Sequence, residues 1–434
     1  MVESQWSSSS SLPPAKRNPS PWQSELCSDL LGLVLQRLPS HADRVRLRAV
    51  CRSWRAAAAA AGAPPPMPWL ALRDGGLIDL DGNPVRCPRP ILRDGVVSFH
   101  PVGGGNLVFL EHDDGGCSLM NPLSAASGDR DDPLLPLPEL AAAVRRAVDS
   151  CETPTVATYT PKPSYSTVIM SSSPVVADSS SSPPDTLVAA LILNRCAVAI
   201  STCKRHDGAA ASFSFMDERS RIRSVWLRAT AICAIVFLHG KLYAVTSKEG
   251  LHVLDLDNGG GGEGGAVLRP CIADDPEKKS VHVDVERRGH LVVRYVVESG
   301  GRLLMVRWWK SLPPPVWSAD RPPSRFDVLE AADGLGRWKA VDSLRGRALF
   351  LGKADSRSVV AGGGGGGAGA REDCIYFMRR SFWYPSKEED FGQSGVYDMR
   401  SGEISPPQLP ERGTAELRLH CEYPRWFYPA DYSY

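Results

Sequence analysis

The hydrophobic positions near the N-terminus follow the period of an α-helix. Six apolar residues recur on one helix face: Leu26, Leu30, Leu31, Val34, Leu35 and Leu38. Pro39 ends this helix, and Ser40 with Asp43 provides the start of a second one. Apolar positions continue to Trp54, and an alanine run extends them to residue 61. The pattern predicts three short helices within residues 22–61, followed by a Pro-rich linker over 62–68.

From Trp69 onward the pattern changes to short apolar runs separated by Gly, Asp and Asn. Many short strands with turn signals between them indicate a sandwich, a barrel or a propeller. A sandwich of about 100 residues is too small for this stretch, whereas a propeller grows by adding blades. We therefore expect a propeller over 69–434. The clearest strands are expected at 96–99, 107–110, 187–193, 197–202, 232–238, 242–246, 251–256, 282–285, 291–297, 303–308, 326–330, 338–341, 348–351, 374–377 and 395–399.

A recurring strand-and-turn pattern supports repetition in this region. An apolar strand end, an Asp and a nearby Gly recur at 78–82, 253–259 and 396–402, with a looser copy at 326–334. Three inserts, 171–184, 259–265 and 362–369, are rich in Ser or Gly and are expected to be loops. One helix is expected at Glu139–Val148, since Leu140, Val144 and Val148 share one face.

Charge and composition narrow the class of protein. The 434 residues carry 50 basic and 49 acidic side chains, which argues against a dedicated nucleic-acid or membrane-surface protein. The longest apolar run, 187–200, is interrupted by Asn194-Arg195 and is too short to cross a bilayer. Residues 1–21 are Ser/Pro-rich, unlike a signal peptide, and are expected to be disordered. Eleven cysteines without a C-x-x-C pair indicate free thiols in the cytoplasm, the nucleus or both.

Motifs for catalysis are incomplete throughout the chain. The glycines near Gly352-Lys353 have the wrong spacing for a phosphate-binding loop, and His420-Cys421-Glu422 lacks the downstream cysteines of a zinc deaminase. Asp255-Leu256-Asp257 begins like a calcium loop, but Ala266 stands where the last carboxylate is required. We therefore predict no catalytic, cofactor-binding or metal-binding residues and no cofactor.

The N-terminal helices carry a more specific pattern, which ends in Cys51-Arg52-Ser53-Trp54-Arg55. From Trp22 to about Ala57 the chain resembles an F-box, a three-helix module that docks on a Skp-type adaptor of a cullin ubiquitin ligase. Cys27 stands where that family usually has Pro. The cysteine can fill the same small apolar site, but it does not stiffen the backbone that enters the first helix. The alternative is that these apolar residues only form a small helical core. Forty residues make a poor isolated core, however, and an exposed apolar patch usually marks a partner.

The C-terminal half carries a second resemblance. The segments 325–328, 338–344, 348–352, 374–377 and 395–399 follow one another in an order that looks like the KIB-type β-propeller found behind many plant F-boxes. The likeness is strongest over 325–410, and the Gly362–Gly369 run departs from it. The fold class expected is therefore mainly β, with a small N-terminal three-helix F-box followed by a β-propeller.

The two resemblances together imply a substrate-receptor subunit of an SCF-type E3 ubiquitin ligase that is not itself an enzyme. The expected partners are a Skp-type adaptor, through it a cullin-RING ligase, and an unknown protein target, with no nucleic acid and no membrane. The alternatives are an F-box scaffold that does not direct ubiquitination and, from a third class, a propeller hydrolase.

The adaptor-binding residues expected from the F-box resemblance are Leu26, Leu30, Leu31, Val34, Leu35, Leu38, Pro39, Val50, Cys51 and Trp54. Their division between the core of the module and its docking surface is left open. Aromatic and basic residues that follow predicted strands are candidates for target binding, namely Trp309, Trp317, Arg379, Trp383 and Tyr384. The alternative for these residues is burial over a blade edge or in the channel, because Trp is highly buried on average.

Overall fold

The chain divides into two compact units, Met1–Pro64 and Pro65–Tyr434. A computed structural model describes residues 28–36, 38, 41–60, 67–72, 74–80, 82–103, 106–124, 134–149, 165–171, 186–192, 197–203, 210–215, 232–255, 268–278, 284–286, 290–311, 324–332, 336–352, 355–361, 370–378, 394–405 and 425–429. The predicted disordered tail at 1–21 and the two glycine-rich inserts lie outside these residues, as does the Ser-rich insert apart from Ser171.

The first unit contains the three short helices expected from the sequence. They are α2 (Ser28–Gln36), α3 (His41–Val50) and α4 (Arg52–Ala60). Leu31 and Leu35 of α2, Leu47 of α3 and Ala58 of α4 form its buried core. The small alanine side chains let α4 approach its neighbours closely, so a core this small can still exclude water.

The second unit is built from strands that form six sheets among the described residues, here named blades 1 to 6 in chain order. Blade 1 contains β1 (Trp69–Ala71), β2 (Leu77–Ile78), β3 (Pro84–Val85) and β26 (Arg425–Phe427). Blade 2 contains β4 (Val96–Val102), β5 (Leu107–His112), β6 (Cys117–Met120) and β7 (Leu135–Pro136), after which comes helix α5 (Pro138–Asp149). Blade 3 contains β8 (Tyr165–Met170), β9 (Thr186–Ile192), β10 (Ala197–Cys203) and β11 (Ala210–Phe215).

The remaining three blades complete the unit. Blade 4 contains β12 (Ile232–Leu238), β13 (Lys241–Thr246), β14 (Leu251–Asp255) and β15 (Leu268–Ile272). Blade 5 contains β16 (Asp284–Glu286), β17 (His290–Glu298), β18 (Leu303–Ser311), β19 (Arg325–Ala331) and β20 (Trp338–Ala340). Blade 6 contains β21 (Arg347–Leu351), β22 (Arg357–Val360), β23 (Cys374–Phe377), β24 (Gly395–Asp398) and β25 (Ile404–Ser405). Pairing is antiparallel except between β21 and β23.

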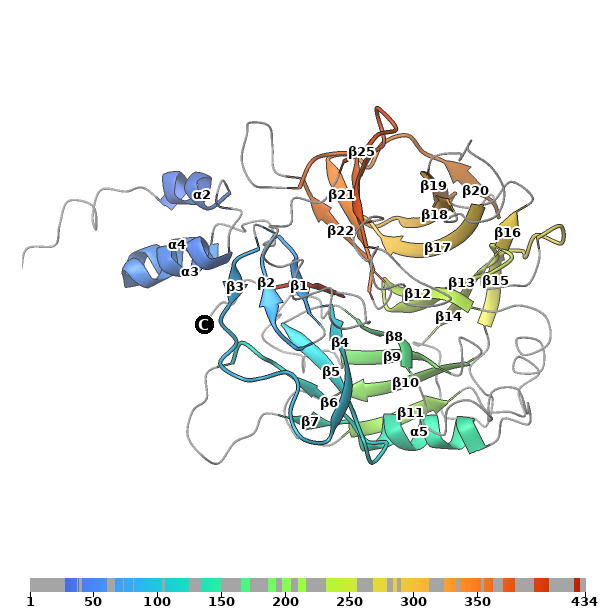
Figure 1. The fold of residues 1–434 in the computed structure, drawn as a ribbon, viewed down its shortest axis with the longest axis horizontal. Helices are drawn as coiled ribbons and strands as arrows, with labels where there is room; N and C mark the ends of the chain where they lie inside the picture. Colours follow the sequence, from blue (N-terminus) through green and yellow to red (C-terminus); the bar gives the residue numbers. More distant parts are fainter. Residues whose placement is uncertain are drawn as a thin grey trace, which may run out of the picture. The chain divides into compact units, whose positions relative to one another are not determined.

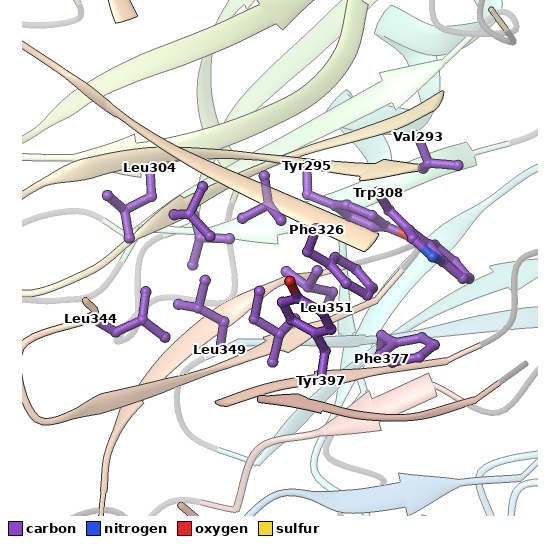
Figure 2. Close-up of a cluster of buried hydrophobic side chains, with 14 residues drawn as sticks. Val293, Tyr295, Leu304, Trp308, Phe326, Leu344, Leu349, Leu351, Phe377 and Tyr397 are labelled. Atoms are coloured by element: carbon purple, nitrogen blue, oxygen red, sulfur yellow. The ribbon is translucent and has the colours of Figure 1, made fainter. Parts of the chain in front are cut away.

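The blades follow one another in chain order, from blue at β1 to orange at β25 (Figure 1). The buried side chains of this unit lie between successive blades, which is the core arrangement of a β-propeller. Each junction has its own hydrophobic cluster, and the one between blades 5 and 6 contains stacked and tilted aromatic rings (Figure 2). Another cluster joins blade 6 to blade 1, and the next joins blade 1 to blade 2. The blades therefore close into a ring, and the chain is mainly β with a helical N-terminal module.

Burial on both faces explains why several strands are continuously apolar instead of alternating. In β5, Phe109 faces the junction with blade 3, whereas Val108 and Leu110 face the junction with blade 1. In β21, Leu349 and Phe350 likewise belong to different junctions. The apolar runs of these two strands are thus buried on both faces of the sheet, which is why they do not alternate with polar residues.

The expected Asp-Gly turns are present at two positions. Gly82 has φ 78° and donates its N–H to the Asp79 carbonyl, and Gly402 has φ 75° and donates to the Asp398 carbonyl. The third copy runs out of the described residues after Asp255. The expected helix at Glu139–Val148 is α5, and its Leu140 and Val144 are buried against blades 2 and 3.

Several boundaries differ from the sequence prediction, and two of them change where particular residues belong. The strand expected at 303–308 continues to Ser311 as β18 because it pairs with β17 along its whole length, so Trp309 lies within the strand and does not follow it. The linker was expected to reach residue 68, but Met67 packs on the cluster between blades 6 and 1 and Pro68 is buried. Both residues therefore belong to the propeller unit.

Candidate partner-binding surfaces

The first helix divides its apolar residues between the core and the solvent. Leu31 and Leu35 are 2% and 0% exposed, whereas Leu30, Leu33 and Val34 are each between 44% and 53% exposed. At 3.6 residues per turn, positions 30, 33 and 34 lie side by side on the helix face next to the core face. Among the described residues of its own unit, α2 therefore leaves an apolar surface exposed.

The second helix adds two exposed apolar residues. Val45 and Val50 are 48% and 57% exposed, whereas Leu47 between them lies in the core. We call Leu30, Leu33, Val34, Val45 and Val50 the apolar surface of the helical module. Several exposed apolar side chains on one small module usually mark a protein–protein contact.

Side-chain to backbone contacts hold the ends of the helices in place. Arg44 is buried in α3, and its Nε donates to the Leu38 carbonyl at 2.6 Å, which ties the end of α2 to α3. Cys51 precedes α4, where its sulfur accepts the Trp54 N–H at 3.5 Å and lies 3.0 Å from the Ser53 hydroxyl. These two contacts lower the pKa of the Cys51 thiol, the Ser53 contact contributing most.

The adaptor-binding residues expected from the sequence fall into three groups. Leu31 and Leu35, whose place the sequence left open, lie in the core of the module, and Leu38 and Trp54 are half-buried beside them. Leu30, Val34 and Val50 are exposed, and Cys51 is half-buried. Leu26 and Pro39 lie outside the described residues. The expected adaptor-binding residues did not include Leu33, which falls off the apolar spacing of the first helix, or Val45, which the apolar spacing of the second helix includes.

On the propeller, the two neighbouring tryptophans of β18 point to opposite faces of blade 5. Trp308 is 1% exposed and stacks on Phe326 in the junction with blade 6. Trp309 is half-buried on the other face, where its Nε1 donates to an Asp327 oxygen at 2.6 Å and the Arg325 guanidinium lies 4.8 Å from its ring. Trp317, Arg379, Trp383 and Tyr384 lie outside the described residues.

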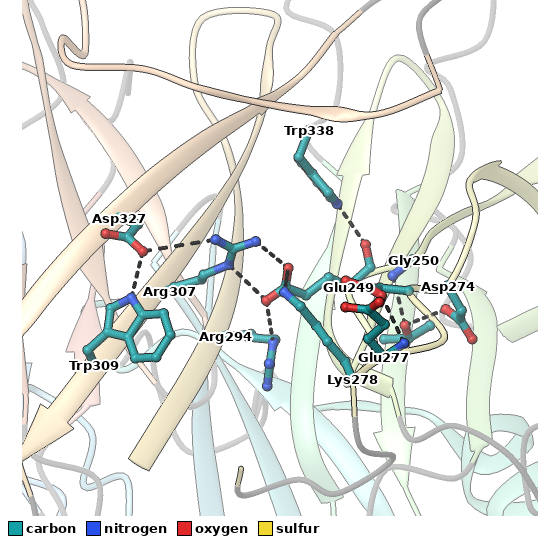
Figure 3. A network of polar contacts seen from close by, with 12 residues as sticks. Glu249, Gly250, Asp274, Glu277, Lys278, Arg294, Arg307, Trp309, Asp327 and Trp338 are labelled. Carbon is teal, nitrogen blue, oxygen red and sulfur yellow. Dashed lines mark hydrogen bonds and ion pairs between the residues drawn. The ribbon is translucent and has the colours of Figure 1, made fainter. Parts of the chain in front are cut away.

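The buried carboxylate of Glu249 forms ion pairs with three cations, Lys278, Arg294 and Arg307 (Figure 3). Glu249 accepts hydrogen bonds from Arg294 Nε at 2.9 Å and Arg307 Nε at 2.8 Å, and it also pairs with Lys278. Its backbone carbonyl accepts the Trp338 indole N–H at 2.7 Å. Arg307 extends the network toward Asp327, 4.0 Å away. The network fastens the turn between β13 and β14 of blade 4 onto blade 5.

The backbone of Glu249 has a left-handed conformation that usually favours glycine. In the equivalent turns of blades 1 and 2 the left-handed residue is Gly75 or Gly115, each donating its N–H to a carbonyl three residues earlier. In blade 4 the same position is Glu249, with φ 63°. A side chain in this conformation costs about 1–2 kcal/mol, so the ion pairs must offset that strain.

The titration of this group follows from its surroundings. Burial alone would raise the pKa of Glu249, but the hydrogen bonds from Arg307 and Lys278 and the charges of Arg307 and Arg294 lower it to about 2. Burial lowers the pKa of Lys278, and the charges of the two arginines act in the same direction, against the pull of Glu249. Glu249 is therefore ionised near neutral pH.

A small cavity lies where the inner parts of blades 3 to 6 converge. Its walls include Thr167, Cys233, Arg294, Tyr295 and Asp355. Its volume is about 20 Å³, which is room for a water molecule or two. Among the described residues, no group of three His, Cys, Asp or Glu side chains is placed to hold a metal ion. No helix in the described part of the chain is both long and apolar enough to span a bilayer.

Comparison with protein families identifies both units. The model of the F-box domain matches residues 23–59, and the model described as KIB1-4 beta-propeller matches residues 82–398. The chain belongs to the KIB1-4 beta-propeller family. An F-box domain thus precedes a propeller of this family, and domains of both kinds typically serve as adaptor or interaction modules. F-box domains generally bind Skp1-type adaptors in SCF complexes.

Solved structures give only distant likenesses. One is a chain from an S. cerevisiae assembly of Dbp5 bound to Nup159, Gle1, IP6 and ADP, with 8% identity and a TM-score of 0.26, covering 64% of each chain. Another is a GH43 β-1,3-galactosidase with galactodeoxynojirimycin, with 10% identity and a TM-score of 0.28, covering 62% of this chain and 88% of that one. This chain spans less than two thirds of the first structure's length. No curated protein matches it in sequence.

Proposed function

We propose that this protein is the substrate-receptor subunit of an SCF-type E3 ubiquitin ligase. The observation that carries the proposal is the apolar surface of the F-box domain. Its core is already filled by Leu31, Leu35 and Leu47, so the exposed leucines and valines do not serve the fold of the module. Burying one Leu or Val side chain fully is worth about 1.5–3 kcal/mol, which a docked adaptor would recover.

The mechanism requires no bond chemistry from this chain. The F-box domain docks on a Skp-type adaptor and through it on a cullin-RING ligase, while the propeller holds the target protein. Target lysines then lie within reach of a ubiquitin-charged enzyme carried by the rest of the complex. The rate gain comes from effective concentration and orientation.

Docking is tested by co-purifying the full-length protein with a Skp-type adaptor. We expect Leu30→Asp combined with Val34→Asp to abolish co-purification, because two charges then replace the apolar surface of α2. Val97→Asp is the matched control, since Val97 is 50% exposed on the propeller unit and should leave adaptor binding unchanged. Circular dichroism must show that the helices of the double variant persist. Wild-type binding by that folded variant would remove the proposal.

The step beyond docking is tested separately, because an F-box scaffold would bind the adaptor without directing ubiquitination. A protein that proximity labelling finds on the propeller is incubated with the reconstituted ligase, ubiquitin and ATP. We expect its ubiquitination to depend on Leu30 and Val34. An interactor that binds the complex stably but is neither modified nor degraded faster would instead identify a scaffold.

A further inference from the structure

The last two helices of the F-box domain carry a strong positive charge. Residues 41–60 contain five arginines and one aspartate, although the whole chain is nearly neutral. Positive charge gathered on two short helices is unfavourable unless carboxylates neutralise it. The question is which of these arginines the fold itself uses.

Arg44, Arg46 and Arg55 make side-chain contacts within the module. Arg44 is buried and donates to the Leu38 carbonyl, and Arg46 pairs with Asp43 through a 2.7 Å contact. Arg52 and Arg55 are exposed, and no carboxylate of the described residues pairs with either. Arg55 Nε donates to the Arg48 carbonyl at 3.3 Å, which holds the Arg55 side chain beside the end of α3.

The position of Arg52 is also wrong for helix stability. It is the first residue of α4, where the N-terminal end of the helix dipole is positive and repels a cation. The same charge near the C-terminus of α3, at Arg48, is favourable. Neither the dipole of α4 nor a carboxylate of the described residues stabilises the charge of Arg52.

Arg52 is two positions from Val50, the most exposed residue of the apolar surface. Val50 lies between Arg48 and Arg52 in the sequence and is 57% exposed. An apolar centre with a polar rim rich in Arg is the anatomy of a protein interface. We propose that Arg52 and Arg55 form a cationic rim of the adaptor-docking surface and bind an acidic patch on the Skp-type adaptor.

This assignment rests on the proposed function, and it adds the charge of the partner and a kinetic role. Rim charges act mainly on the association rate, because they steer the two proteins before the apolar surfaces meet. Salt weakens such steering as the Debye length falls from about 10 Å at 0.1 M to about 3 Å at 1 M. Docking should therefore be fast at low salt and slower at high salt.

The test measures association and dissociation rates of the full-length protein with a Skp-type adaptor from about 0.1 M to about 1 M salt. For Arg52→Glu combined with Arg55→Glu, we expect the association rate at low salt to fall about tenfold and the dissociation rate to change far less. The difference from wild type should vanish near 1 M. Arg52→Lys combined with Arg55→Lys should keep most of the wild-type rate.

The control is Arg86→Glu combined with Arg269→Glu, which reverses two exposed charges on the propeller unit and should leave the rates unchanged. If wild type binds the adaptor but the charge-reversed variant shares its rates and salt dependence, the cationic rim is wrong while docking stands. If wild type does not bind the adaptor at all, the proposed function itself fails. The same variant is also tested for binding to an RNA duplex. If it keeps the wild-type adaptor rates but loses RNA binding that wild type shows, the cationic rim is wrong and the two arginines bind nucleic acid.

Discussion

Trp69 and Phe427 lie directly opposite each other in β1 and β26, and their rings stack with centroids 5.6 Å apart and an interplanar angle of 6°. This pair joins the first and the last described strand of the propeller, which are more than three hundred residues apart in sequence. The preceding residue of β26, Trp426, donates its indole N–H to the Leu351 carbonyl of blade 6 at 3.0 Å. Blade 1 therefore closes the ring toward both neighbours.

We expect Phe427→Ala to lower the free energy of unfolding of the propeller by about 3–5 kcal/mol, as large-to-small substitutions at buried aromatics do. Phe427 is 1% exposed, so the substitution leaves a cavity at the closing blade. Denaturant unfolding followed by tryptophan fluorescence measures the loss. Ile404→Ala on edge strand β25 is the control and should cost less than about 1 kcal/mol, because Ile404 is already 40% exposed. Equal losses would mean that closure does not depend on this stack.

Substituting the two neighbouring tryptophans of β18 should have different effects on stability and on target binding. Trp308→Ala should destabilise the propeller by about 3–5 kcal/mol, because Trp308 packs between Phe326 and Phe377. Trp309→Ala should cost less than half as much, since Trp309 is only half-buried. We propose that Trp309 contacts the target, so its variant should lose partners in a pull-down while keeping a near wild-type melting temperature. A melting shift that accounts for all of the partner loss would retire this role for Trp309.

The Glu249 cluster should make stability depend on pH in the acid range. The pKa of Glu249 is lowered to about 2 when folded, against 4.5 when unfolded, so its contribution is complete above pH 4.5. It is lost as pH falls from about 4.5 toward 2. The difference corresponds to roughly 3 kcal/mol.

The measurement compares the free energy of unfolding of wild type and Glu249→Gln between pH 7 and pH 3. We expect the variant to be less stable by a few kcal/mol near pH 7, because it leaves buried cations without their partner, and the gap to narrow as pH falls. Glu277→Gln is the control, since Glu277 is exposed in the neighbouring loop. A gap that is independent of pH would show that the lost stability is not electrostatic.

Gly352 is one of the glycines of blade 6 at which the surrounding backbone leaves no room for a side chain. A Cβ on Gly352 would lie 2.6 Å from the Asp355 carbonyl oxygen and 3.1 Å from Trp426, and a backbone oxygen cannot move aside cheaply. We expect Gly352→Ala to lower the free energy of unfolding by about 1–3 kcal/mol. Gly301→Asn is the control, because a Cβ there meets nothing within 4 Å and Asn tolerates the left-handed backbone. If both variants keep wild-type stability in thermal unfolding, the close approach at Gly352 is not a constraint.

Local sequence determined most elements of this protein. The helical spacing of leucines predicted α2, the strand at 232–238 coincides with β12, and Asp with Gly marked two turns. These features depend on neighbours within a few residues, whose spacing is visible in the chain. The family of each unit was also recognisable, because motifs with fixed spacing carry it.

Tertiary structure alone decided which apolar residues are exposed and which charged residues meet. Leu30 and Leu31 look alike in sequence, and only the packing of α4 over one side makes Leu31 core and Leu30 surface. Trp308 and Trp309 are divided in the same way by the two faces of blade 5. Glu249 and Arg307 are fifty-eight positions apart, and β26 pairs with a strand at the other end of the chain. Such contacts form only when the blades close, because long-range pairing depends on the geometry of the ring and not on local spacing.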